Sequence, residues 1–202
     1  MNTATTPPRK TLQPLWLRAV HWINVLAVLV MILSGWRIYN ASPIFSFSFP
    51  GEYTLGGWLG GAILWHFAAM WVLVLNGLLY LGMNLGTGRM RQRFFPLSLG
   101  GMIRDMVDAL RGKLSHGDLS QYNQVQRVAY LLALADLVLL VLSGLAVWKP
   151  VQLSWITTLL GGFQGARTVH FVAMALLVAF IVVHVLMVVL VPRTLRIMII
   201  GR

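Results

Sequence analysis

The sequence contains no cysteine, which excludes disulfide bonds, thiolate catalysis and cysteine-ligated zinc or iron–sulfur centres. Charge is also scarce, because only 10% of the 202 residues are charged and just five are acidic. What the chain has instead is apolar: 58% of its residues are hydrophobic, and the mean hydropathy is +0.76. A soluble domain of this size does not carry so high an apolar fraction. The composition therefore predicts an integral membrane protein.

The shortage of acidic residues leaves a net charge of +11. In a soluble protein this charge would suggest a nucleic-acid partner. In an apolar chain it is better explained by the gathering of Lys and Arg on the cytoplasmic side of a membrane, so we expect no nucleic acid. The first fourteen residues are polar and proline-rich and lack an apolar core, so we expect no cleavable signal peptide.

Four apolar segments are long enough to cross a bilayer as helices. They predict an all-α, integral membrane four-helix bundle that forms a single domain over residues 1–202. The predicted spans are about 18–39, 57–83, 125–148 and 167–191. The connection at 84–124 is long, and apolar residues recur at helical spacing within it, which predicts an amphipathic helix over about 98–114 at the membrane surface.

Lys and Arg are distributed unevenly between the two sides of these spans. Thirteen of them fall in the N-terminal segment, the 84–124 connection and the C-terminal tail. The two other connections hold only Arg37, Lys149 and Arg167. This asymmetry predicts that both termini are cytoplasmic, in a multi-pass protein of the bacterial inner membrane.

Four histidines fall inside the apolar segments, where ionisable groups are costly and usually mark function. His170 and His184 share the last span and are fourteen residues apart. This spacing puts them on one helix face, within about 40° of each other and about 21 Å apart along the axis. His66 is expected at the depth of His170, on the periplasmic side. His21 is expected at the depth of His184, on the cytoplasmic side.

Two histidine pairs at two depths are what two bis-histidine haems require. A single intramembrane histidine is often a hydrogen-bonding or proton-relay group, and two together can bind copper or zinc. A transporter or scaffold without redox chemistry would require the layering of all four to be accidental. We therefore predict two b haems, with iron ligands His66 and His170 in one layer and His21 and His184 in the other.

Haem propionates are anionic and lie near the membrane faces, so basic residues at helix ends are candidate partners. On the periplasmic side these are Arg37, Lys149 and Arg167, and on the cytoplasmic side we assign Arg18, where Arg127 and Arg193 also lie. Ordinary snorkelling of long basic side chains is the alternative for each. Asp136, near the middle of the third span, could handle protons or make a structural hydrogen bond. His116, in a polar loop, is interpreted as a solvated side chain.

The two halves of the chain resemble each other, which suggests duplication of a helix pair. Leu33-Ser34-Gly35 is echoed by Leu142-Ser143-Gly144, and both His66 and His170 begin the pattern His-Phe-x-Ala-Met. In the same register, His21 aligns with Tyr130.

The stretches Arg18-Ala-Val-His21-Trp22 and Trp65-His66-Phe67, with the spacing of His170 and His184, resemble the bacterial di-haem cytochrome b family. That family includes cytochrome b-561 and the cytochrome b subunits of nickel–iron hydrogenases, formate dehydrogenases and thiosulfate reductases. The resemblance implies the same pairing of histidines as the depth argument. The segments 35–40 and 148–152 are most similar to the thiosulfate-reductase-type branch.

The resemblance implies a membrane electron conduit between the quinone pool and a periplasmic redox partner, expected to be a molybdopterin oxidoreductase. The chain would then be the electron-transfer subunit of a quinone-linked oxidoreductase, with no catalytic residues of its own. Quinone, as substrate or exchangeable ligand, is expected near the haem at the His21 end. The alternative is a stand-alone superoxide:ubiquinone oxidoreductase of the cytochrome b-561 type. The apolar outer surface would face the lipid bilayer or a second copy in a homodimer.

Overall fold

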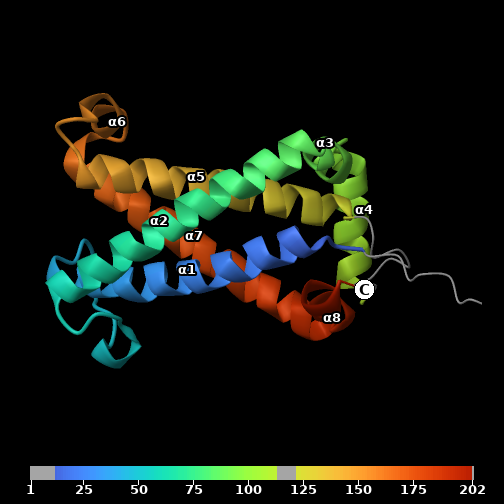
Figure 1. The fold of residues 1–202 in the computed structure, drawn as a ribbon, viewed down its shortest axis with the longest axis horizontal. Coiled ribbons are helices and arrows are strands. Elements are labelled where there is room, and N and C mark those ends of the chain that lie inside the picture. The colour runs from blue at the N-terminus through green and yellow to red at the C-terminus, as the bar shows by residue number, and fades with distance from the viewer. Residues whose placement is uncertain (1–11, 113–121, 202) are drawn as a thin grey trace, which may run out of the picture.

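The computed structural model describes residues 12–112 and 122–201, and within them every regular element is a helix. Four helices are long and apolar enough to cross a membrane, which confirms the predicted all-α membrane bundle (Figure 1). These are α1 (Leu15–Ala41), α2 (Leu59–Gly86), α5 (Gln124–Trp148) and α7 (Gly162–Leu190).

The helix ends differ by up to five residues from those of the predicted apolar segments. Helix α1 begins at Leu15 and α7 at Gly162, which are three and five residues earlier than expected. The reason is that backbone hydrogen bonding defines a helix end, and hydropathy does not report it. Before α7, Gly161 has a φ of 85°, a left-handed conformation that favours glycine. At the start of α5, Asn123 and Gln126 form a reciprocal capping box.

The four long helices form two hairpins. Helix α1 packs closely along α2, and α5 packs closely along α7, whereas contact between the hairpins is sparser. A buried amide links the first hairpin, because Asn76 Nδ2 donates to the Val20 carbonyl at 2.8 Å and to Asn24 Oδ1 at 2.6 Å. Such hydrogen bonds stabilise helix association where the apolar surroundings offer no competing partner.

An apolar cluster joins the two hairpins at mid-height. Buried Ala27, Val28 and Ile32 of α1 meet Leu73 of α2 and Leu177 of α7. Outward-facing apolar side chains, in contrast, remain exposed; examples are Leu64, Leu75, Leu132 and Val182. This distribution is the one expected of a bundle surrounded by lipid, where the outer surface needs no polar covering.

One end of the bundle, called here the α6 end, carries α6 (Ser154–Leu159), the 3-10 helix η1 (Gly51–Tyr53) and the aromatic segment 42–58 (Figure 1). In this segment Phe45, Phe47 and Phe49 gather around Tyr39 and Phe171. The rings therefore attach the segment to the ends of α1 and α7.

The opposite end, called here the α8 end, carries α3 (Arg89–Phe94), α4 (Leu99–Leu110) and α8 (Arg193–Ile200) (Figure 1). Helix α4 corresponds to the amphipathic helix expected over 98–114, but it ends at Leu110; positions 113 and 114 lie outside the described residues. Its Leu99, Ile103, Met106 and Leu110 are all exposed. This apolar stripe is suited to lying on a lipid surface.

Candidate functional site

The structure brings the four intramembrane histidines together as two pairs. His66 of α2 and His170 of α7 lie at the α6 end, with ring centroids 6.4 Å apart. His21 of α1 and His184 of α7 lie at the α8 end, with ring centroids 6.2 Å apart. Each pair spans the two hairpins, and α7 supplies one ring to each. These are the pairs that depth and spacing predict.

The separation of the rings fits one metal ion between them. A metal–imidazole bond is about 2.0 Å and a ring nitrogen lies about 1.1 Å from its centroid, so two axial rings have centroids about 6.2 Å apart. Both pairs are close to this value. In residues 12–112 and 122–201 no group of three or more His, Cys, Asp or Glu side chains is placed to hold a metal ion. Two axial ligands suit haem, whose porphyrin provides the other four, rather than a tetrahedral zinc site.

The α6-end histidines are held by hydrogen bonds from two equivalent positions. His66 Nδ1 lies 3.1 Å from Ser34 Oγ, and His170 Nδ1 lies 3.1 Å from Ser143 Oγ. Both serines are completely buried. They belong to the repeated Leu-Ser-Gly motif, whose repetition is visible in the sequence but whose serine has no role that the sequence alone predicts.

The glycine of each motif leaves room for the neighbouring ring. A Cβ atom added to Gly35 would lie 3.4 Å from His66 Cε1, and one added to Gly144 would lie 3.1 Å from His170 Cε1. Both rings therefore pack directly against the backbone of the adjacent helix. The motif acts as a seat for histidine, in which glycine provides the space and serine provides the hydrogen bond.

The α8-end histidines are surrounded by aromatic rings. His184 stacks on Phe180 at a centroid distance of 5.7 Å, with Tyr130 edge-on at 6.4 Å, and His21 lies edge-on to Trp22 at 5.4 Å. Among the described residues no hydrogen bond reaches a ring nitrogen of His21 or His184. The two pairs thus share their separation and differ in their supports.

The basic residues predicted to bind propionates lie near helix ends, and three of them have protein partners. Arg18 Nη1 donates to the Ile199 carbonyl at 2.6 Å, which ties α1 to α8. Arg167 donates to the Ser42 carbonyl and to Gln164, and Lys149 lies 4.7 Å from the ring centre of Trp148. Arg37 is half-buried near the end of α1. Their role towards propionates stays a prediction.

Further candidates lie in α3, at the α8 end of the bundle, and the sequence did not single them out. Arg89 Nε and Arg93 Nη1 are buried and have no hydrogen-bond partner among the described residues, as is also true of Arg18 Nε. Burial and then repulsion by Arg93 lower the pKa of Arg89. The Arg93 guanidinium lies over Tyr122 at 5.9 Å, and Tyr122 contacts Tyr130, which in turn contacts His184. Arg89 Nη2 donates to Gln13 Oε1 at 2.9 Å, so only its Nε, with Nη1 of Arg93, still requires an acceptor. Carboxylates such as propionates would satisfy these buried nitrogens.

A buried indole offers a comparable donor in α1: Trp36 Nε1 also lacks an acceptor within the described part of the chain. Unpartnered donors of this kind fit a cofactor that carries carboxylates. The signal available in the sequence was the basic run at 89–93, which was used only to orient the chain.

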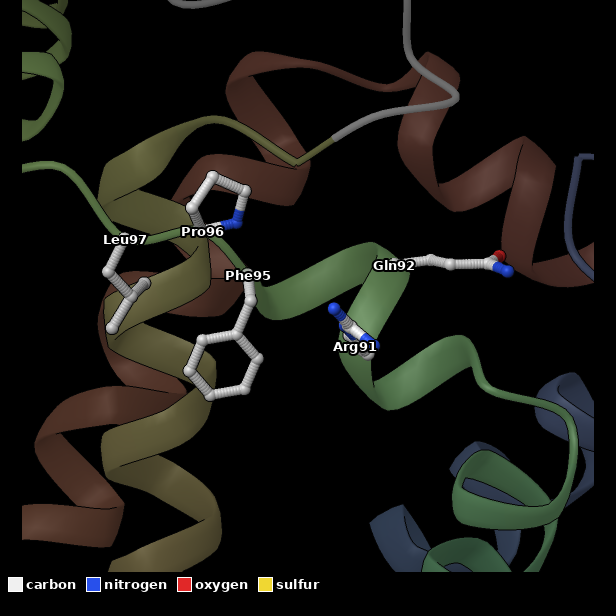
Figure 2. Close-up of a pocket in the computed structure, with 5 residues that line it drawn as sticks. All are labelled: Arg91, Gln92, Phe95, Pro96 and Leu97. Carbon is white, nitrogen blue, oxygen red and sulfur yellow. The ribbon is translucent and has the colours of Figure 1, made fainter.

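Three other features have no assigned role in holding a cofactor. Asp136 Oδ2 is buried and has no partner among the described residues. His116 lies outside the described residues. Figure 2 shows an open pocket around the α3–α4 connection, lined by Arg91, Gln92, Phe95, Pro96 and Leu97. No histidine lines this pocket, so we assign it no role in cofactor binding.

Comparison with known proteins extends over nearly the whole chain. The model of the family described as prokaryotic cytochrome b561 matches residues 12–201. The chain is 59% identical, over 94% of its length and 96% of the relative's, to the putative protein-methionine-sulfoxide reductase subunit YedZ1 of Azospira oryzae. It is 26% identical, over 83% of its length and 74% of the relative's, to a probable Ni/Fe-hydrogenase B-type cytochrome subunit of Cupriavidus necator. A subunit of the same description from Rhizobium leguminosarum is 24% identical over 83% of this chain and 75% of its own.

The match covers all four spans and both histidine pairs. With it, the paired rings and the apolar bundle acquire a common explanation, because b-type haem is the cofactor of that family. The chain belongs to the prokaryotic cytochrome b561 family and is a multi-pass membrane electron-transfer subunit of the b-haem type.

Proposed function

We propose that the protein binds two b haems, one in each histidine pair, and conducts electrons between the quinone pool and a redox partner outside the membrane. One observation carries the proposal: α7 holds one member of each pair, at opposite ends of the bundle, and both pairs have the separation of axial haem ligands. Haem supplies reversible one-electron chemistry when bound. The protein's residues hold it in place and control its surroundings.

The residues between the pairs suit a conduit insulated from water. The fourteen-residue spacing on α7 puts the two ligand positions about 21 Å apart along the axis, which is most of the thickness of a bilayer core. Leu177 lies midway between His170 and His184 and is buried in the central apolar cluster. That cluster excludes water between the two sites, so the sites communicate through packed side chains.

The charge distribution supports an orientation with the α8 end in the cytoplasm. Described basic residues gather there, in α3, α8 and the ends of the adjoining spans, and few lie at the α6 end. Both termini are then cytoplasmic, and His66 and His170 form the periplasmic pair. The membrane is the bacterial inner membrane in this proposal.

The name of the Azospira oryzae relative suggests the partner. That protein is described as a subunit of a protein-methionine-sulfoxide reductase. We propose that this chain likewise delivers electrons to a periplasmic reductase that converts methionine sulfoxide to methionine and water, which consumes two electrons and two protons. Electrons then flow outwards, from quinol near the α8-end pair. The prediction that the partner carries molybdopterin is part of this proposal.

The superoxide:ubiquinone alternative has less support. It would benefit from free cations at the α6 end to steer an anionic substrate. Of the three cations there, Arg167 is instead bonded to Ser42 and Gln164 and Lys149 lies against Trp148, which leaves only Arg37 for this steering among the described residues. The electron-conduit proposal needs no such steering.

Haem quantitation by the pyridine haemochrome method, on the purified full-length chain, tests the proposal. Two b haems per chain, both reduced by added quinol, are expected. One haem per chain would mean that one histidine pair serves another purpose, and haem that quinol leaves oxidised would remove the quinone from the proposal. Reoxidation of the quinol-reduced protein by a methionine sulfoxide reductase and its substrate, but not by substrate alone, would identify the partner.

A further inference from the structure

We propose that Ser34 and Ser143 are positioning residues that fix the tautomer of the α6-end histidines and make that site electronically different from the α8-end site. The inference rests on the proposed function, because it concerns haem bound between His66 and His170. It does not depend on the identity of the partner or on the direction of electron flow. The inference is based on the direction of the hydrogen bonds between Ser34 and His66 and between Ser143 and His170.

Each serine hydroxyl already uses its only proton elsewhere. Ser34 Oγ donates to the Val30 carbonyl at 2.5 Å, and Ser143 Oγ donates to the Leu139 carbonyl at 2.6 Å. A hydroxyl has a single hydrogen but two acceptor lone pairs. Towards the histidine, each serine oxygen therefore accepts, and the Nδ1 of the ring must be the donor.

For His170, a backbone carbonyl independently supports the same position of the proton. His170 Nδ1 lies 3.1 Å from the Leu140 carbonyl, and Met31 holds the equivalent sequence position beside Ser34. Leu140 and Met31 each lie three residues before the serine of their motif. Because a carbonyl oxygen can only accept, the shared proton belongs to Nδ1. Nε2 then keeps its lone pair, which is the form required of a haem ligand.

These hydrogen bonds also change the ligands electronically. A hydrogen bond from the distal nitrogen of a ligating imidazole to an acceptor raises the basicity of the ligand. A more basic ligand stabilises ferric over ferrous iron, so second-shell hydrogen bonds are one of the means by which a protein sets haem potential. Both α6-end ligands have such bonds, and neither α8-end ligand does among the described residues. We therefore expect the two serines to hold the α6-end potential down.

The test is a redox titration, followed spectroscopically, of the full-length chain carrying Ser34→Ala and Ser143→Ala, singly and together. Two haems per chain should remain, since the ligands are intact. The potential of one haem should rise, most in the double variant, while the other stays at its wild-type value. The low-spin ferric EPR signal of the same haem should shift. The His66→Ala variant, which is expected to keep only the α8-end haem, identifies which signal is which.

Thr168→Ala is the matched control. Thr168 lies two residues before His170, and its hydroxyl donates to the Gln164 carbonyl four residues back, as each serine hydroxyl does in its own helix. The hydroxyl of Thr168 has no recorded contact with a histidine ring among the described residues. Its removal should leave both potentials and both EPR signals unchanged.

Other outcomes separate the inference from the proposed function. Unchanged potentials in the double alanine variant, with two haems bound, would overturn the inference, as would an equal shift of both haems. If the alanine variants lose the α6-end haem, Ser34→Thr and Ser143→Thr decide: retention of that haem with threonine supports the hydroxyl role, and loss contradicts it. A wild-type protein without two haems would instead contradict the proposed function itself.

Discussion

The two ends of α7 hold their histidines by different means. At the α6 end, His66 and His170 occupy equivalent positions of the internal repeat, and each rests on the same Ser-Gly seat. At the α8 end the repeat has diverged: the counterpart of His21 is Tyr130, and Tyr80 follows His66 by the same fourteen residues that separate His184 from His170. In the α6-end pair, therefore, each histidine packs against a copy of the same local motif. In the α8-end pair the two histidines occupy unlike positions of the repeat and are supported by aromatic packing.

This contrast shows that equal ring separation does not require equal surroundings. Hydrogen bonds fix both the orientation and the proton of a ring, whereas stacking fixes mainly its plane. If both sites hold haem, their potentials should differ for this reason alone.

The largest expected effect is the loss of one haem when a single histidine of either pair is replaced by alanine. His66→Ala or His170→Ala should reduce the haem content from two per chain to one by deleting the α6-end haem. His21→Ala or His184→Ala should delete the α8-end haem instead, because in the proposed function each ring would be one of the two protein groups that hold its haem. Haemochrome quantitation with a redox titration measures both the number and the identity of the remaining haem. A variant of these four that keeps both haems would refute the ligand assignment.

Gly144→Ala should weaken the α6-end site specifically. The new Cβ would lie 3.1 Å from His170 Cε1, so the ring or the helix must move, at a cost of about 1–3 kcal/mol typical of overpacking. We expect partial loss of one haem, and a smaller loss for Gly35→Ala, where the distance is 3.4 Å. Gly77→Ala, which meets nothing within 4 Å, is the control. The measurement is the haem content of each variant, which should be lowest for Gly144→Ala, higher for Gly35→Ala and highest for Gly77→Ala. The reverse order would contradict the role of these glycines in leaving room for the histidine rings.

Asn76→Leu should destabilise the first hairpin without selecting either histidine pair. The substitution removes both hydrogen bonds from α2 to α1, a loss of about 1–2 kcal/mol in an apolar environment. Thermal unfolding in detergent should shift to lower temperature while two haems remain bound. Asn24→Ala removes only one of these bonds and should have the smaller effect. Selective loss of one haem would show that Asn76 supports a site rather than the hairpin.

Trp22→Phe should produce the smallest effect, confined to the α8 end. Its Nε1 donates to the Met198 carbonyl at 3.1 Å, and the loss of one such bond at a partly exposed position costs about 0.5–1.5 kcal/mol. Hydrogen exchange should become faster in α8, since Arg18 would then be the remaining α1 side chain that donates to a carbonyl of its last turn. Trp155→Phe, at an exposed position of α6, should leave this exchange unchanged. Unaltered protection of α8 in Trp22→Phe would contradict the proposed tether.

Local features of the sequence were sufficient for the architecture. The apolar runs predicted all four spans because burial in lipid demands a continuous stretch of suitable length. They located helix ends less well: α7 begins at Gly162 rather than near 167, since the first turns are polar. The expectation that basic residues serve propionates was drawn from position alone, and the structure shows that Arg18 and Arg167 also bind backbone carbonyls.

The sequence by itself determined that the chain is a helical membrane protein and that His170 and His184 share a helix face, because hydropathy and helical periodicity are local properties. Only the tertiary structure decided that Ser34 and Ser143 meet the α6-end rings and that Phe180 and Tyr130 contact His184. It also decided that one nitrogen each of Arg89 and Arg93 is buried without a partner among the described residues. These contacts join different helices. They depend on how the two hairpins rotate and pack against each other, which no periodicity within a single helix specifies.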